Sequence, residues 1–170
     1  MILESIWNVT ALHTMNRYLI YILSPLFYIC VSLAGRSFTS HGIDPWYQTI
    51  AKPSFTPPGM IIGIVWTVIY ILTALSLIVF TNNAKGKTIF WPVFVLYIVN
   101  GIINAAWSYI FFTKHLLGPA VLDAGLIGIT VLLLIQFTRH YSKAASILLV
   151  PYLAWVSFAT YLTYVIYRMN

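Results

Sequence analysis

The chain has 170 residues, of which 61% are hydrophobic and only 7% are charged, and its mean hydropathy is +0.89. A soluble domain carries about 25% charged residues, so this composition excludes a water-facing globular protein and indicates an integral membrane protein. The net charge of +6 comes from nine Lys and Arg residues against three acids. These cations fall mostly between apolar runs, where they set membrane topology, so we expect no nucleic-acid binding.

The chain begins with a segment, 1–16, that we predict to be an N-terminal extension. Residues 1–14 carry Glu4 but neither Lys nor Arg, so the positive region of a signal peptide is missing. Met15 offers an alternative translation start directly ahead of the first apolar run. We expect residues 17–170 to form a single domain.

Five segments are apolar enough to cross a bilayer, which takes about 20 residues. They are 18–35, 60–80, 89–113, 116–138 and 144–167. The last four are joined by short connections, which make neighbouring helices antiparallel. We therefore predict an all-α integral membrane protein, a five-transmembrane-helix bundle with a long lid loop between helices 1 and 2.

The basic residues indicate the orientation only weakly. The alternation of spans assigns one membrane face to Arg17, Lys85, Lys87, Arg139 and Lys143, and the opposite face to Arg36, Lys52, Lys114 and Arg168. Five against four slightly favours a cytoplasmic N-terminus. The lid loop is expected on the face opposite the N-terminus, together with the C-terminus.

The lid loop is the one long polar interruption of the sequence. It covers about 24 residues, 36–59, against a usual upper length of about 12–15. Pro53, Pro57 and Pro58 lack backbone donors, which argues against helix interior or central strand in 46–59. Its aromatic residues, lysine and rigid prolines favour an ordered cover over the helices on either side.

Several unusual side chains are predicted to lie at similar depth beneath the lid. At 1.5 Å per residue, Trp66 and Asp123 lie roughly 10 Å below the lid face, and Asn104 and Ala159 lie at about 12–14 Å. Trp107 is slightly shallower, and Trp155 is near the bilayer centre. The tryptophans are either packing residues or the walls of a pocket for a planar hydrophobic ligand.

Two polar residues inside the spans each allow a structural and a functional interpretation. Asp123, the only acid within a span, either braces two helices or takes part in function. Asn104 shares one helix face with Asn100, Trp107 and Phe111, and its amide either bonds a neighbouring helix or contacts a ligand.

No metal-spaced cluster is evident, and all four histidines lie in termini or connections, so we predict no metal site and no required cofactor. Gly59 with Gly63, and Gly101 with Ala105, are small-residue pairs that allow close helix approach. The second pair is a candidate seam for a homodimer.

One set of motifs resembles the TspO/MBR family, the tryptophan-rich sensory and translocator proteins whose mitochondrial members were called peripheral benzodiazepine receptors. The matching positions are Trp46, Tyr47, Lys52, Pro53, Phe55, Pro57, Pro58, Gly59, Trp66, Tyr70, Asn104, Trp107, Phe111, Phe112, 151–155, Phe158, Ala159 and 167–170. The resemblance covers about residues 17–170. Two positions differ in residue type: the family often has tryptophan at the motif position of Phe55, and asparagine where Thr163 stands.

This resemblance implies a membrane receptor or sensor that binds porphyrins such as protoporphyrin IX, and also benzodiazepine-type drugs. The implied ligand-binding residues are Tyr47, Pro57, Trp66, Tyr70, Asn104, Trp107, Trp155 and Ala159. The resemblance further implies light-dependent porphyrin degradation in which Trp66 and Trp155 act catalytically. The alternative is a transporter of tetrapyrroles or sterols. A homodimer in a bacterial cell membrane is expected.

Overall fold

The computed structural model describes residues 2–42, 46–84 and 86–170, with side chains described from residue 19 onward except at 41–45 and 85. Its elements are α1 (Ile2–Gly42), α2 (Trp46–Thr49), α3 (Gly59–Ala84), α4 (Phe90–Ser108), the π-helix η1 (Tyr109–Thr113), α5 (Leu117–Arg139) and α6 (Lys143–Met169). Within these described ranges, five helices are long and apolar enough to cross a membrane. The predicted five-helix membrane fold is confirmed.

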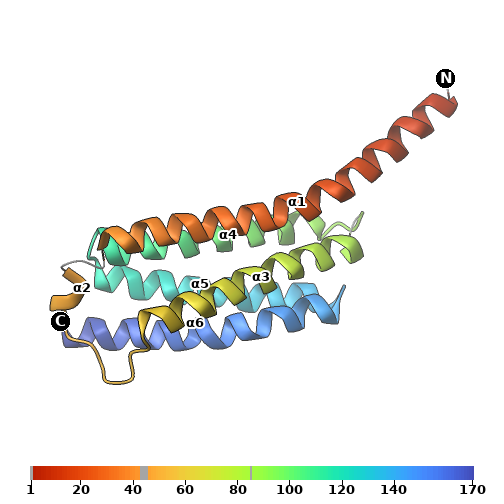
Figure 1. Cartoon of the computed structure of the whole chain (residues 1–170). Coiled ribbons are helices and arrows are strands. Elements are labelled where there is room, and N and C mark those ends of the chain that lie inside the picture. Colours follow the sequence, from red (N-terminus) through yellow and green to blue (C-terminus); the bar gives the residue numbers. More distant parts are fainter. Residues whose placement is uncertain (1, 43–45, 85) are drawn as a thin grey trace.

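The long helices form an elongated bundle (Figure 1). The lid and the C-terminus lie together at one end of the bundle, and the first part of α1 projects beyond the other end (Figure 1). Helix α1 begins at Ile2. Residues 2–16 of the predicted N-terminal extension are therefore part of this helix. Lys85, which we assigned to the face opposite the lid, lies outside the described residues.

The first predicted boundary is wrong, because α1 continues past Gly35 to Gly42. Residues 36–42 are rich in Ser and Thr and look like loop in sequence, but their hydroxyls bond to the helix itself. Thr39 Oγ1 donates to the Gly35 carbonyl at 2.7 Å, and Ser40 Oγ donates to the Ser37 carbonyl at 2.9 Å. The connection to α3 is correspondingly shorter than predicted.

The lid also differs from its prediction in one respect: residues 46–49 form the short helix α2. The prolines that argued against helix begin only at Pro53, so they leave Trp46–Thr49 free to make one turn. The remainder, up to Pro58, is irregular.

The end of the bundle away from the lid is a packed core. Side chains that are at most 1% exposed fill it, including Leu77, Phe80, Tyr97, Leu134 and Leu149. Hydroxyl groups tie its helices together: Ser76 Oγ lies 2.6 Å from the Tyr97 hydroxyl and donates to the Ala145 carbonyl at 2.7 Å. This half of the bundle is therefore closed.

Gly101 of α4 lies against α1 of the same chain. A Cβ atom at this position would lie 2.6 Å from Cε1 of Phe27 and 3.2 Å from Cγ2 of Val31. The missing side chain thus lets α1 and α4 approach each other. The predicted homodimer seam at Gly101 is therefore wrong, because this surface is already occupied within one chain.

Replacing Gly101 with Leu should separate α1 from α4 and destabilise the protein by about 1–3 kcal/mol, the usual cost of overpacking. Thermal unfolding in neutral detergent measures this effect. Gly125→Leu is the matched control, since nothing lies within 4 Å of a Cβ atom at that glycine. Equal unfolding temperatures for the two variants would contradict the role assigned to Gly101.

Candidate functional site

A large cavity opens beneath the lid, in the half of the bundle that the core leaves unfilled. Its volume is about 1120 Å³, slightly above the roughly 300–1,000 Å³ usual for small-molecule sites. All eight predicted ligand-binding residues line it: Tyr47, Pro57, Trp66, Tyr70, Asn104, Trp107, Trp155 and Ala159. These eight residues come from the lid and from three long helices, α3, α4 and α6, and they meet around one space.

The walls of the cavity are aromatic. Trp66 stacks on Tyr70 with ring centroids 5.7 Å apart, and Trp107 stacks on Phe111 at 5.0 Å. Trp155 packs at a tilt against Phe158 at 5.3 Å. Rings held in this way present flat, rigid surfaces to whatever fills the cavity.

The floor of the cavity is held by a chain of hydrogen bonds that crosses the bundle. The Tyr70 hydroxyl donates to Asn104 Oδ1 at 2.6 Å, and Asn104 Nδ2 donates to the Tyr152 hydroxyl at 2.8 Å. The Tyr152 hydroxyl donates in turn to Asn100 Oδ1 at 3.1 Å, and Asn100 Nδ2 donates to Thr130 Oγ1 at 2.8 Å. The chain joins α3, α4, α5 and α6.

Asn104 makes the interhelical bonds that one of its two interpretations predicts, while its contact with a ligand stays a prediction. Its side-chain oxygen and nitrogen both bond to neighbouring helices, and the residue also lines the cavity. Because both ends of the amide are bonded, its orientation is fixed before any ligand arrives.

Aromatic contacts hold the lid over the cavity. Trp46 stacks on His115 at 4.0 Å, Tyr47 packs edge-on against Phe112 at 5.5 Å, and Phe55 stacks on Tyr161 at 5.9 Å. Phe55, one of the two departures from the family pattern, thus keeps an aromatic contact between lid and α6. Burial raises the pKa of the Tyr47 phenol above its ordinary value of 10.0, so this group is neutral at physiological pH.

Polar contacts add to this attachment. The backbone of Ala51 exchanges two hydrogen bonds with the side chain of Asn170, at 2.9 and 3.0 Å. The Lys52 ammonium donates to the Tyr47 carbonyl and lies 4.4 Å from the centre of the Tyr47 ring. The part of the lid from residue 46 to residue 58 is therefore an ordered cover in this structure.

The π-helix η1 ends α4 directly under the lid. Its wider turn is closed by a bond from the Lys114 amide to the Tyr109 carbonyl at 3.0 Å. Such turns interrupt helices mainly at functional sites. Here the turn carries Phe111 and Phe112, which both contact Tyr47.

Asp123 does not line the cavity, although its neighbour Ala124 does. Its Oδ2 atom is buried and has no hydrogen-bond partner among the described residues. The predicted bracing bond is thus not seen at this oxygen.

Because Asp123 lies outside the lining, Asp123→Asn should leave the affinity for a bound porphyrin within a few-fold of the native value. The amide has nearly the same shape as the carboxylate and removes only its charge. Titration of the purified variant with protoporphyrin IX measures this. Abolished binding in a variant that still unfolds cooperatively would show that the carboxylate contributes to the site.

Sequence reasoning missed the contribution of α1 to the cavity. Ser32, Gly35, Arg36, Thr39 and Ser40 all line it. Their spacing of 3, 4, 7 and 8 residues from Ser32 is that of one helix face. The sequence contains this spacing, but the predicted first span stops at Gly35 and therefore leaves out Arg36, Thr39 and Ser40.

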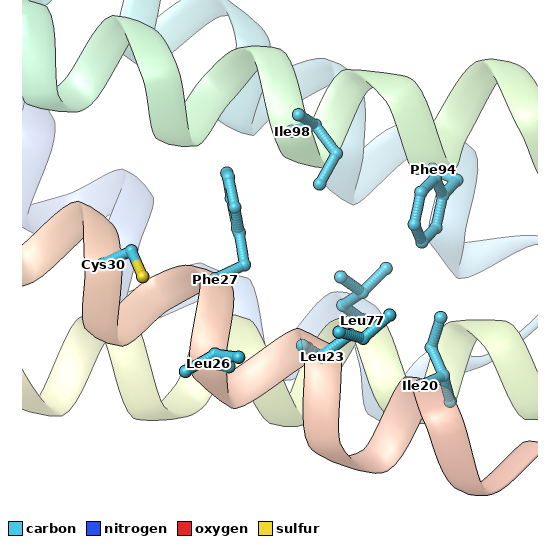
Figure 2. A pocket seen from close by; sticks show the side chains of 9 residues that line it. Ile20, Leu23, Leu26, Phe27, Cys30, Leu77, Phe94 and Ile98 are labelled. Atoms are coloured by element: carbon cyan, nitrogen blue, oxygen red, sulfur yellow. The ribbon is translucent and has the colours of Figure 1, made fainter.

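A second, smaller hollow of about 350 Å³ lies between α1, α3 and α4 (Figure 2). Phe27 points from α1 toward α4, and Phe94 and Ile98 point back from α4 (Figure 2). Its one hydroxyl, on Ser24, already donates to the Ala74 carbonyl at 3.0 Å. This hollow therefore lacks polar groups that could recognise a specific ligand.

The described residues contain no group of three or more His, Cys, Asp or Glu side chains that could hold a metal ion. The chemistry available in the large cavity is thus that of indoles, phenols, amides and hydroxyls, together with the cations Arg36 and Lys52.

Five membrane-spanning helices around a lidded cavity with aromatic walls define a multi-pass membrane protein with a cavity of small-molecule size. The TspO/MBR family model matches residues 21–168, and the chain belongs to this family. It is 46% identical over 148 residues to the tryptophan-rich protein TspO of Bacillus cereus, covering 85% of this chain and 94% of that protein. It is 34% identical over 147 residues to the TspO protein of Archaeoglobus fulgidus, covering 84% and 91%. It is also 32% identical over 126 residues to the human translocator protein, covering 74% and 75%.

Proposed function

We propose that this protein is a membrane receptor for planar tetrapyrroles such as protoporphyrin IX, bound in the cavity beneath the lid. The observation that carries the proposal is the lining of the 1120 Å³ cavity by three tryptophans, Trp66, Trp107 and Trp155. A porphyrin is a flat apolar disc, and each stacking contact with an aromatic face adds on the order of 1 kcal/mol beyond area burial. Smaller planar compounds of the benzodiazepine type fit the same chemistry.

A light-dependent enzymatic activity is the second candidate function. Trp66 and Trp155 lie on α3 and α6 and line the same cavity, so both indoles would be near a bound porphyrin. An indole is the most easily oxidised of the apolar side chains in the cavity. The illuminated porphyrin would accept one electron from either indole and leave an indole radical, and oxidative breakdown of the porphyrin ring would then consume dissolved dioxygen as the oxidant.

Transport of tetrapyrroles or sterols is the alternative, and the packing opposes it. Below the floor formed by Tyr70, Asn104 and Tyr152, the far half of the bundle is filled by fully buried side chains such as Phe80 and Tyr97. A path through the described residues would require this core to open. A receptor requires only the lid to move.

The decisive experiment is a titration of the purified protein with protoporphyrin IX in the dark, followed by quenching of tryptophan fluorescence. We expect saturable binding. Ala159→Trp should abolish it by filling the cavity that Ala159 lines, whereas Ala154→Trp, on the exposed face of α6, should bind like the native protein. Native affinity in Ala159→Trp would reject the cavity as the binding site.

The same samples distinguish a sensor from an enzyme when they are illuminated. Loss of the porphyrin absorbance in native protein, but not in Ala159→Trp, supports the light-dependent activity. Stable absorbance of the bound porphyrin supports a receptor without turnover.

We further propose that the protein is a homodimer in a bacterial cell membrane. The 46% identity to the relative from Bacillus cereus supports this location. Because Gly101 packs against α1, a dimer would use a different surface. Chemical crosslinking in native membranes tests the assembly.

A further inference from the structure

We propose that Arg36 binds a carboxylate of the ligand in an opening between α1 and α3, so that the site selects acidic planar amphiphiles over neutral ones. This inference rests on the proposed binding function and adds the chemical class of the ligand and its orientation. It concerns residues of α1 that do not belong to the predicted site.

The cavity reaches the outer surface of the bundle between α1 and α3. Met60, Ile64 and Val68 line the cavity, yet they are 78%, 58% and 48% exposed. Side chains that are both on the lining and on the surface mark the rim of an opening. Since this surface spans the membrane, the opening faces lipid.

Two hydrogen bonds join α1 and α3 at the end of the bundle away from the lid. Ser24 Oγ donates to the Ala74 carbonyl at 3.0 Å, and Asn82 Nδ2 donates to the Tyr21 hydroxyl at 2.9 Å. Toward the lid the two helices diverge (Figure 1). The opening lies in this divergent part.

The two rims of the opening differ in chemistry. On α1, a polar face of Ser32, Arg36, Thr39 and Ser40 borders the cavity. On α3, Gly59 and Gly63 line the opposite side, and nothing lies within 4 Å of a Cβ atom built at either one. A flat molecule can therefore lie against the glycine side with its polar edge toward α1.

Arg36 is the cation on this rim that is free to bind a ligand. The hydroxyls of Thr39 and Ser40 already donate to backbone carbonyls, and the Lys52 ammonium is bonded to the Tyr47 carbonyl. The Arg36 side chain has no hydrogen-bond or ion-pair partner among the described residues. Its guanidinium offers five donors in a fork that matches a carboxylate.

Among the residues that the structure describes, the charged side chains that line the cavity are the two cations Arg36 and Lys52. Arg36 is exposed on this rim, so its guanidinium is accessible to an anion. A bound amphiphile would therefore place its aromatic body among the tryptophans and its carboxylates at Arg36.

The test compares protoporphyrin IX, which has two carboxylates, with its dimethyl ester, which has none and keeps the same ring. Arg36→Gln should weaken binding of the diacid about tenfold, as expected for loss of a charge-assisted pair, and should leave the ester within about twofold. Arg36→Lys should recover part of the diacid affinity. Arg139→Gln, at the opposite end of the bundle, is the matched control and should change neither.

Equal losses for diacid and ester in Arg36→Gln would mean that Arg36 only supports the fold, and no loss for either would mean that it does not contact the ligand. Both results overturn the inference. The preference for the diacid should also persist in nanodiscs that contain phosphatidylglycerol. If the preference for the diacid disappears in these nanodiscs, Arg36 binds the phosphate of the lipid instead of the ligand, and this result overturns the inference as well. If the native protein binds neither compound, the proposed function itself fails.

Discussion

Trp66→Phe and Trp155→Phe should each abolish most of the light-dependent loss of porphyrin absorbance while weakening porphyrin binding only about fivefold. Phenylalanine keeps an aromatic ring and most of the apolar area, so the affinity lost corresponds to about 1 kcal/mol. It is much harder to oxidise than indole, so a reaction that needs an indole radical stops. Dark titration measures the affinity, and absorbance under illumination measures turnover.

Two tryptophans provide controls for this prediction. Trp91→Phe should leave both quantities unchanged, because Trp91 is 67% exposed and lies outside the cavity lining. Trp107→Phe removes an indole from within the cavity and shows whether any lining tryptophan suffices. If Trp66→Phe and Trp155→Phe both retain full light-dependent loss, the two residues are ordinary packing and the enzymatic proposal loses its support.

Four of the five spans could be predicted closely because hydropathy alone defines them. The predicted segment 60–80 corresponds to α3, 116–138 to α5 and 144–167 to α6, each within a few residues. The predicted segment 89–113 corresponds to α4 and η1 together. In lipid every backbone group must bond within its own helix, so a long apolar run has few alternatives.

The end of α1 could not be predicted in the same way, because residues 36–42 are polar. Hydropathy ends the helix where the apolar run ends, at Gly35. In the structure, however, Arg36 and Thr39 face the cavity, so a polar helix face is stable at this depth. Whether these polar residues of α1 line the cavity depends on the shape of the opening between α1 and α3, and the sequence does not specify this shape.

The sequence predicts that Trp66, Asn104 and Trp155 lie around one cavity, because in antiparallel helices the position along the sequence gives the depth in the membrane. The sequence does not predict the hydrogen-bond partners of these residues. Tyr70 and Tyr152 are aromatic residues of two predicted spans, now α3 and α6. The rotation of each helix about its axis decides which amide each hydroxyl reaches. That rotation follows from side-chain packing among all five helices.

The Tyr152 hydroxyl is the central link of the hydrogen-bond chain under the cavity, so Tyr152→Phe should destabilise the protein by about 1–3 kcal/mol. Tyr152 is 2% exposed, and its hydroxyl both accepts from Asn104 Nδ2 and donates to Asn100 Oδ1. Removing it leaves two amide atoms, Asn104 Nδ2 and Asn100 Oδ1, without this partner. Thermal unfolding in neutral detergent measures the loss.

Tyr164→Phe is the matched control for this change, since Tyr164 lies on the same helix, α6, but is 45% exposed and should lose nothing measurable. Porphyrin affinity gives a second readout, because an Asn104 amide that has lost one bond no longer holds the cavity floor in a single orientation. Combining Tyr152→Phe with Asn104→Leu should cost less than the sum of the two single changes, as expected for residues in one network. Strictly additive losses, or an unfolding temperature for Tyr152→Phe equal to that of Tyr164→Phe, would show that the chain of hydrogen bonds does not act as a unit.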